Sequence, residues 1–410
     1  MAVQVNQLST TAITAHAFNA DRSQLSVCEN TNEVKLYSKS GSGWSLTETL
    51  TDHDKVVTSI DWAPNRNQIV TASQDRNAYV WNYEIDPLDP SSKARWHPTL
   101  VLLRLNRSAT VVKWSPDEQK FAVGSGSRTI AVCQYDHESN WWVAKHIKKP
   151  LRSTVLALDW HPNSVLLASG AADGRCRVFS AFIKGVDSKP APNKWGERLP
   201  FNTVCGDFGS PAGGWVHDVA FSPSGDALAF VSHDATVTVV YPSGADQPPS
   251  AIWTIKLASL PLLSLCFCTE DVFVTAGHDC QPVLFSGDQG NGWQQVKSLD
   301  EQKGGGSAQQ QRGGNPAGGI GRLNNEAFNL FRAADSRGVT GPSGGAVAGG
   351  NRAGVDTVHS NTITSIRPFS GASGSVNQVS TSGVDGKVVI WNLQSGGLGG
   401  VTKGMGNMRM

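Results

Sequence analysis

The chain has 410 residues, and its 35 basic and 34 acidic residues give a formal net charge of +1. This balance excludes a strong overall attraction to nucleic acid. No apolar run reaches the roughly 18 residues of a membrane helix, so no membrane insertion is expected. Residues 1–7 lack both the basic start and the apolar core of a signal peptide, which predicts a cytoplasmic protein.

Seven cysteines are scattered through the chain, six of them in predicted strands or tight turns. An odd number in core-like positions favours buried reduced thiols over a disulfide framework. Cys266, Cys268, His278 and Cys280 form the one grouping that could suggest a metal. Zinc sites usually place two or more residues between paired cysteines, so we predict no metal and no cofactor.

A motif of β-favouring residues that ends in an aromatic residue recurs along the sequence. The repeat-ending residues are Tyr37, Trp81, Tyr135, Phe179, Tyr241, Phe285 and Trp391. Their successive spacings are 44, 54, 44, 62, 44 and 106 residues. A period of roughly 40–45 residues with four short strands is typical of a propeller blade. We therefore predict an all-β fold, a seven-bladed propeller of four-stranded antiparallel blades.

The blades divide the chain into one domain and its insertions. Residues 1–286 and 359–395 are predicted to form the propeller, and radial closure limits its exposed sheet edges. The last blade offers three strands, so we expect residues around Val3 to Ile13 to supply the fourth, with Leu398 to Thr402 as a competitor. Residues 287–358 and the tail 396–410 are rich in Gly and small polar residues, which predicts flexible segments.

An acidic residue stands six positions before the aromatic in several repeats. Asp75 precedes Trp81 in this way, and the same position is held by Asp173, Asp279 and Asp385, while Asp234 stands six before Val240. A carboxylate in a tight turn accepts hydrogen bonds and fixes the turn, so we interpret these acids as structural. No Gly-x-Ser-x-Gly elbow precedes a helix, and we predict no enzyme.

A concentrated basic run spans residues 145–152 and includes Lys145, Lys148, Lys149 and Arg152, and we expect Arg104 and Arg107 nearby. One interpretation is a solvated edge. The other is a docking surface for an acidic partner, where charge would mainly set the association rate and specificity.

One amphipathic segment, residues 320–332, interrupts the Gly-rich insertion. Its apolar residues Ile320, Leu323, Phe328, Leu330 and Phe331 fall on one face at helical spacing. Such a helix could pack back on its own propeller, or it could insert its apolar face into a partner's groove. The long Gly-rich flanks favour the second interpretation.

Several long strings resemble the WD-repeat subunit of the actin-related protein 2/3 complex. They are residues 53–64, 75–81, 121–128, 141–150, 158–163 and 176–187. The resemblance implies a non-catalytic scaffold within a seven-subunit assembly that nucleates branched actin filaments in cortical actin structures. It implies contact with two actin-related proteins, neighbouring small subunits, the actin filament and nucleation-promoting factors. Carried over, contact with actin or the activator falls on Leu323, Phe328, Leu330 and Phe331, with Ile320 on the same face.

The chain departs from the repeat pattern in a few places. The third repeat has Ser127-Arg128 where an Asp would stand, and the first has Asn30-Thr31-Asn32. Trp81 and Trp391 precede Asn rather than Asp. A second functional hypothesis is a WD-repeat peptide-binding adaptor or substrate receptor outside any actin assembly. A stable association with two actin-like proteins would distinguish the two hypotheses.

Overall fold

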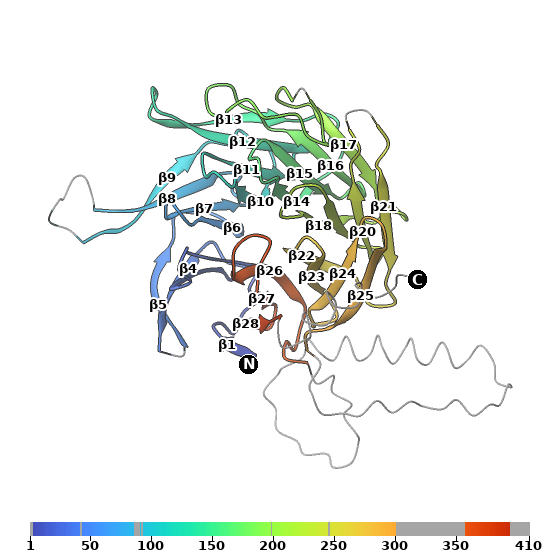
Figure 1. Ribbon diagram of the computed structural model, residues 1–410. Helices are drawn as coiled ribbons and strands as arrows, with labels where there is room; N and C mark the ends of the chain where they lie inside the picture. Colours follow the sequence, from blue (N-terminus) through green and yellow to red (C-terminus); the bar gives the residue numbers. More distant parts are fainter. Residues whose placement is uncertain are drawn as a thin grey trace, which may run out of the picture.

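The computed structural model describes residues 3–41, 43–85, 91, 93–197, 199–244, 247–300 and 357–393. These residues form 28 β-strands in seven four-stranded sheets and contain no helix. Figure 1 shows the sheets arranged around a common centre. The predicted seven-bladed propeller of antiparallel blades is therefore confirmed. The amphipathic segment 320–332 and the tail from residue 394 lie outside the described residues.

Each sheet is one blade, and the first strand of a blade is its innermost. Blades 1 to 3 comprise β2 (Ala15–Phe18), β3 (Gln24–Cys28), β4 (Val34–Ser40) and β5 (Gly43–Leu50); β6 (Val57–Ala63), β7 (Gln68–Ser73), β8 (Ala78–Glu84) and β9 (Arg95–Val101); β10 (Ala109–Trp114), β11 (Lys120–Ser125), β12 (Thr129–Asp136) and β13 (Trp141–Ile147). Blades 4 and 5 comprise β14 (Val155–Trp160), β15 (Leu166–Ala171), β16 (Arg175–Ser180) and β17 (Val204–Gly209); β18 (Val216–Phe221), β19 (Leu228–Ser232), β20 (Thr236–Tyr241) and β21 (Ala251–Lys256). Blades 6 and 7 comprise β22 (Leu262–Thr269), β23 (Val272–Gly277), β24 (Val283–Asp288) and β25 (Gly292–Ser298); β26 (Ile363–Ser370), β27 (Gln378–Gly383), β28 (Lys387–Asn392) and β1 (Gln4–Gln7).

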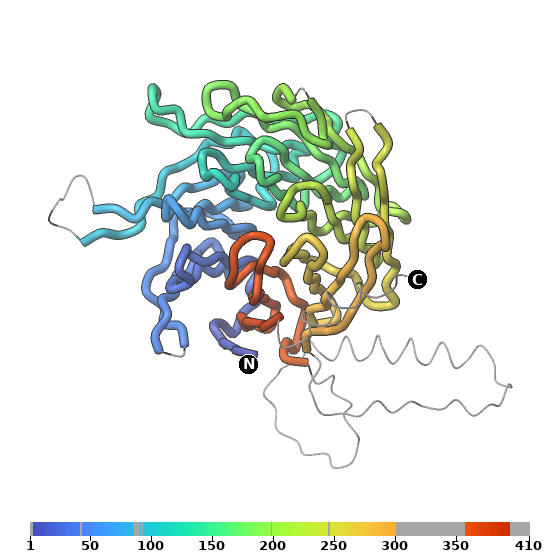
Figure 2. The backbone as a smooth tube through the Cα atoms, in the orientation of Figure 1, coloured from blue at the N-terminus to red at the C-terminus, as the bar shows by residue number. Residues whose placement is uncertain are grey.

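The ring closes through the N-terminal strand. β1 pairs antiparallel with β28, with Gln4 opposite Ile390 and Gln7 opposite Lys387. The tube in Figure 2 shows the blue N-terminal segment beside the red strands of blade 7. β1 is the fourth strand of blade 7, whose other three strands come from the C-terminal part of the propeller. Its pairing with β28 therefore closes the ring.

The hydrophobic core lies between neighbouring blades. Val70 and Val80 of blade 2 pack in the same cluster as Val112 and Phe121 of blade 3. The second strands are buried along most or all of their length, and β11 and β15 are buried at every residue. A strand covered on both faces can be continuously apolar, which explains the unbroken apolar runs of these segments.

Threonine hydroxyls on the inner strands also join neighbouring blades. The Oγ1 atom of Thr58 lies 3.0 Å from the carbonyl oxygen of Ala109, and that of Thr110 lies 2.5 Å from the carbonyl oxygen of Val155. In both blades the hydroxyl sits at a register shift, between Val57 and Ser59 or between Ala109 and Val111. The extra residue of a β-bulge leaves the local ladder, and here it donates to the next blade instead.

One domain boundary predicted from the sequence is wrong. The insertion was expected to begin at residue 287, but β25 (Gly292–Ser298) is the outer strand of blade 6. Its buried Trp293 packs on Phe267 and Phe273. The strand is otherwise rich in Gly, Gln and Ser, so its composition resembles the segment that follows rather than a strand.

Candidate functional site

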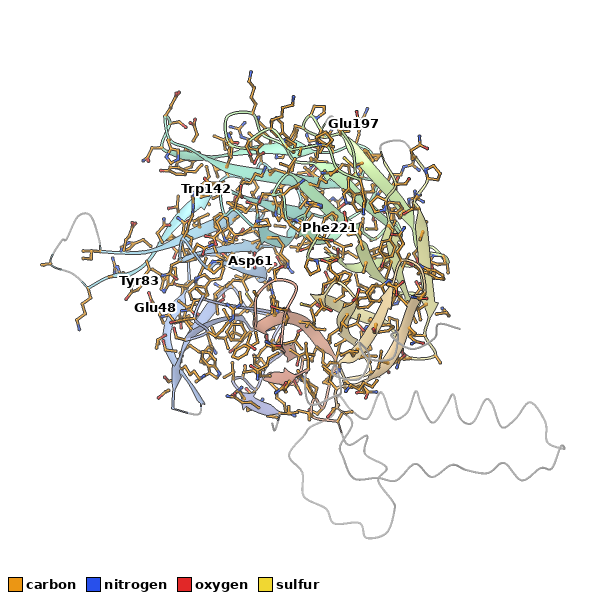
Figure 3. The ribbon with its side chains drawn as sticks, viewed as in Figure 1. Glu48, Asp61, Tyr83, Trp142, Glu197 and Phe221 are labelled. Carbon is orange, nitrogen blue, oxygen red and sulfur yellow. The ribbon has the colours of Figure 1, made fainter. Side chains whose placement is uncertain are left out.

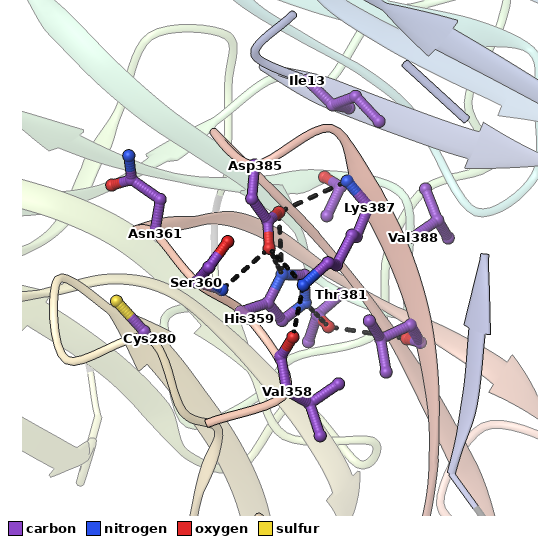
Figure 4. A network of polar contacts seen from close by, with 12 residues as sticks. Ile13, Cys280, Val358, His359, Ser360, Asn361, Thr381, Asp385, Lys387 and Val388 are labelled. Carbon is purple, nitrogen blue, oxygen red and sulfur yellow. Dashed lines mark hydrogen bonds and ion pairs between the residues drawn. The ribbon is translucent and has the colours of Figure 1, made fainter. Parts of the chain in front are cut away.

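Two of the turn acids lie in buried chains of hydrogen bonds. In blade 7 the carboxylate of Asp385 lies 3.1 Å from Nδ1 of His359 and accepts the backbone N–H of Ser360 at 3.0 Å. Nε2 of His359 is 2.7 Å from Oγ1 of Thr381, which accepts the indole N–H of Trp391 at 2.8 Å. Figure 4 shows this network around Asp385, His359 and Thr381. This series of hydrogen bonds connects the turn to β27 and β28, the second and third strands of blade 7.

Blade 2 repeats the arrangement. Oδ2 of Asp75 lies 2.6 Å from Nδ1 of His53, and Nε2 of that ring lies 2.8 Å from Oγ1 of Thr71. The indole of Trp81 donates to the same hydroxyl at 3.0 Å. Hydrogen bonds from His53 and from the backbone outweigh burial and lower the pKa of Asp75. The His and Thr members of these networks were not predicted from the sequence, although each His stands 22 or 26 residues before its acid.

The other three turn acids make different bonds. Asp173 accepts from the guanidinium of Arg177 at 2.9 Å, and Asp234 accepts from the hydroxyls of Ser210 and Thr236 at 2.7 and 2.6 Å. Asp279 accepts the backbone N–H of Leu260 at 3.0 Å. The sequence therefore places a carboxylate at five equivalent turns, but its partners depend on the blade.

The residues of the predicted basic run divide between a strand and a loop. Lys145 lies in the outer strand β13, with its Nζ 6.0 Å from the ring centroid of Phe201. Lys148, Lys149 and Arg152 lie in the loop between β13 and β14, and all four side chains are exposed. No ion pair within the described part of the chain neutralises any of them. An exposed cluster of this kind is available to a partner.

The inner strands surround a central channel of about 610 Å³. Across it, the guanidinium of Arg367 in blade 7 reaches Oδ1 of Asp61 and the carbonyl oxygen of Ile60 in blade 2, each at 2.9 Å. Asp159 accepts the backbone N–H of Phe221 at 2.8 Å, and burial raises its pKa to about 6. Asp61 and Phe221 are labelled near the centre of the ring in Figure 3. These bonds join blades, so the charges of the channel serve ring closure.

A buried lysine fixes the long connection between β16 and β17. The Nζ of Lys120, in blade 3, pairs with Asp187 and donates to the carbonyl oxygen of Ala181 at 3.0 Å. It also lies 5.3 Å from the ring centroid of Trp160. Burial lowers the pKa of Lys120, and the paired carboxylate of Asp187 opposes this shift. Sequence reasoning missed the pair, because the partners are 67 residues apart.

The described residues contain neither a cluster that could hold a metal ion nor a helix that could cross a membrane. No group of three or more His, Cys, Asp or Glu residues there is arranged to hold a metal ion. No helix among these residues is long and apolar enough to cross a bilayer. None of the seven cysteines, all of which lie among the described residues, forms a disulfide. Burial raises the pKa of Cys205 to about 12, so this half-buried thiol stays protonated at neutral pH.

The insertion that carries the amphipathic segment leaves and returns at one place. The backbone N–H of Val358 donates to Oδ2 of Asp300 at 2.8 Å, so the two ends of the segment 301–356 meet beside blade 6. Ile320, Leu323, Phe328, Leu330 and Phe331 lie outside the described residues.

Comparison with known proteins identifies the family. The family model of the WD domain, G-beta repeat, matches residues 44–82 and 145–180. The chain is 47% identical over 382 residues to actin-related protein 2/3 complex subunit 1 of Schizosaccharomyces pombe, which covers 92% of this chain and 96% of the relative. The chain belongs to the family of actin-related protein 2/3 complex subunit 1. Family members at greater distance include subunit 1A-B of Xenopus laevis, 43% identical over 96% of this chain and 97% of its own length. Subunit 1 of Saccharomyces cerevisiae is 39% identical over 95% of this chain and 97% of its own length.

Proposed function

We propose that this chain is a non-catalytic scaffold and actin-contacting subunit of an actin-related protein 2/3 complex. The observation that carries the proposal is the similarity to subunit 1 of that complex over almost the full length of both chains. The partners would be two actin-related proteins, small subunits of the same complex, actin filaments and nucleation-promoting factors. The place of action would be the cytoplasm, at cortical actin structures that contain branched filaments.

The rigid ring supports a scaffold role on physical grounds. Its blades are joined by interblade cores, by hydroxyl bonds between inner strands and by the Arg367–Asp61 pair across the channel. Such a body holds its surface loops in fixed relative positions, which is what a protein that orders several partners requires. The turn acids Asp75, Asp173, Asp234, Asp279 and Asp385 would act as braces of this body rather than as contacts.

Two surfaces would make the contacts with partners. Lys145, Lys148, Lys149 and Arg152 would dock an acidic segment of a partner, and the segment 320–332 would contact actin or the activator. The Val358–Asp300 bond joins the two ends of the insertion, and Leu299 and Val358 bond to Pro282 and Lys387 of blades 6 and 7. The contact made by the segment 320–332 would therefore be tethered to the propeller that carries the basic surface. Two linked weak contacts raise the total affinity through effective concentration.

Purification of the tagged full-length chain at moderate salt tests membership of the complex. We expect co-recovery of two actin-related proteins with several smaller subunits in fixed ratio. Recovery of the propeller alone would contradict the proposal and would favour an adaptor that reads peptides outside any actin assembly.

Substitution of the insertion tests its contact with actin or the activator. Leu323→Asp with Phe331→Asp should slow branch formation in a purified assay while leaving assembly of the complex intact, because two charges would disrupt the apolar face. Asn325→Asp with Asn329→Asp adds the same charge away from that face and should leave branching unchanged. Equal branching by the wild type and the Leu323/Phe331 variant would refute the proposed contact.

A further inference from the structure

The turn between the second and third strands of blade 3 lacks the acid found in blades 2, 4, 5, 6 and 7. In those blades an Asp stands two residues after the end of the second strand, as Asp75 follows Ser73. In blade 3 the equivalent residue is Ser127, two residues after Ser125. The local geometry is the same, since Ser73 Oγ accepts the N–H of Asp75 at 3.1 Å and Ser125 Oγ accepts the N–H of Ser127 at 3.3 Å.

Ser127 keeps the hydrogen bond of the acid but not its charge. Its Oγ accepts the backbone N–H of Arg107, in the loop that enters the blade, at 2.9 Å. Asp385 accepts the N–H of Ser360 from the equivalent loop of blade 7. The hydroxyl of Ser127 also donates to Oδ1 of Asn106 at 2.7 Å. Blade 3 therefore has a neutral brace where five other blades have an anionic one.

The three loops around Ser127 contain only positive charge. They are residues 102–108, 126–128 and 148–154, and none of them is Asp or Glu. We call their cations the blade-3 basic surface; its members are Arg104, Arg107, Arg128, Lys148, Lys149 and Arg152. All six side chains are exposed, and none has an ion pair or hydrogen bond to another residue that the structure describes.

Hydrogen bonds bring the three loops together. The N–H of Gly126 donates to the carbonyl oxygen of Ser108 at 3.0 Å, which joins the first loop to the second. The ring Nε2 of His146 lies 2.9 Å from the carbonyl oxygen of Leu103, which joins the end of β13 to the first loop. Ile147 pairs with Ile130, so the third loop begins beside the turn that carries Arg128.

Arg128 occupies a backbone conformation that suits glycine better. Its φ is +57°. Gly174 and Gly386 hold the equivalent positions of blades 4 and 7 at +72° and +74°, whereas Arg76, Ala235 and Cys280 hold those of blades 2, 5 and 6 at +77°, +57° and +63°. A side chain in the left-handed region costs some conformational energy, but this turn carries one in blades 2, 3, 5 and 6. The left-handed conformation is therefore common to this turn in six blades, and in blade 3 the residue that adopts it adds an exposed guanidinium to the surface.

The chemistry of the surface fits a phosphate monoester. Four of the six cations are arginines, whose planar forks match phosphate oxygens with paired N–H donors. The hydroxyls of Ser108 and Ser153 stand next to Arg107 and Arg152 and have no hydrogen-bond partner among the described residues. A phosphate group offers three acceptor oxygens and nearly two charges, and it can use such neutral donors as well as the cations.

We propose that the blade-3 basic surface binds a phosphorylated serine- or threonine-containing segment of a partner protein. The proposal rests on the docking role proposed above for Lys148, Lys149 and Arg152, and it names the chemical class of the segment that docks. Ser127 keeps the turn braced without placing a carboxylate among the cations.

Peptide binding to the full-length chain, followed by fluorescence anisotropy, tests the proposal. The probes are a labelled Gly/Asn peptide with two phosphoserines, the same peptide with glutamates in their place, and the same peptide with serines. We expect the phosphopeptide to bind about tenfold more tightly than the glutamate peptide, because its oxygens accept more charge-assisted hydrogen bonds. Ser127→Asp should weaken phosphopeptide binding about tenfold, since it places a negative charge within the surface.

Matched variants separate a site from general charge attraction. Lys184→Gln with Lys189→Gln removes two exposed cations from the connection between β16 and β17 and should change the affinity less than about twofold. Arg104→Gln with Arg107→Gln removes two cations from the surface and should weaken binding to the phosphopeptide about tenfold. If Ser127→Asp lowers the melting temperature, the Arg104/Arg107 variant still tests the surface through the same measurement of phosphopeptide affinity.

The outcomes distinguish this inference from the proposed function. Equal affinity for the phosphoserine and glutamate peptides would overturn the phosphate assignment and leave an acidic docking surface. Failure of both peptides to bind would overturn the assignment and the acidic docking role together. Equal loss of affinity in the Lys184/Lys189 control would show attraction by overall charge and would also overturn the assignment.

Discussion

The turns of blades 7 and 3 use the same backbone geometry with opposite chemistry. In blade 7 Asp385 is buried, with 4% of its side chain exposed, and is bonded through His359 to Thr381 and Trp391. In blade 3 Ser127 forms the equivalent bond without charge, and the cations around it have no partner among the described residues. Polar groups that are fully bonded inside a fold stabilise it, whereas exposed charges without partners contribute little to stability. The comparison suggests that blade 7 is built for closure and blade 3 for binding.

Asp385→Ser should have the largest effect on stability. The substitution removes the carboxylate that accepts from the buried His359 ring, while a serine here can still accept the Ser360 N–H as Ser127 accepts that of Arg107. We therefore expect a loss of about 2 kcal/mol in the free energy of unfolding. Denaturant unfolding monitored by tryptophan fluorescence measures this loss. A change below about 0.5 kcal/mol would mean that the blade 7 network is dispensable, and the comparison with blade 3 would fail.

The seam between blades 7 and 1 should also be sensitive to acid. The ring of His16 is fully buried between the hydroxyls of Ser380 and Ser382, each 2.9 Å away. Burial, with the nearby charges of Arg367 and His359, lowers the pKa of His16 from 6.5 to about 3. The unfolded chain therefore binds a proton more readily than the folded one, and stability falls as the pH falls below about 6.5.

His16→Gln tests this acid sensitivity. We expect the wild type to lose about 1–2 kcal/mol through this group between pH 7 and pH 5. The variant, although less stable at pH 7, should lose less over the same range, because the amide does not titrate. Urea unfolding at the two pH values provides the comparison. An equal loss in both proteins would place the acid sensitivity elsewhere.

Arg128→Gly should have a smaller effect, and it should be stabilising. Glycine adopts the left-handed conformation without the side-chain penalty, so the free energy of unfolding should rise by about 0.5–1 kcal/mol. The same variant should bind anionic peptides less tightly. A fall in stability would show that the Arg128 side chain supports the fold and is not free to serve a partner.

The repeat architecture was predictable because it depends on local patterns. The spacing of 44 residues between repeat-ending aromatics predicted the blades, and the acids before them predicted the turns. These features recur within short windows, since each blade must bury its own apolar strands against the next. The one misassigned strand, β25, has a single buried aromatic, Trp293, in a polar and Gly-containing context.

Long-range pairs could not be predicted in the same way. The Arg367–Asp61 and Lys120–Asp187 pairs join residues 306 and 67 positions apart, and no local pattern marks either. The blade-3 basic surface combines local patterns, which the sequence shows, with long-range contacts, which it does not. The run 145–152, its expected neighbours Arg104 and Arg107 and the missing acid at Ser127 were visible in the sequence, but the hydrogen bonds that join the three loops depend on the fold.

The most direct test of this account is the Ser127→Asp variant, measured for stability and for binding in the same preparation. The account predicts a free energy of unfolding within about 0.5 kcal/mol of the wild type, since an aspartate can brace this turn as it does in five other blades once the Asn106 amide turns its NH₂ group toward it. It predicts at the same time a clear loss of affinity for the phosphoserine peptide. Unchanged affinity in a stable Ser127→Asp protein would contradict the claim that the neutral turn of blade 3 allows its cations to bind an anion.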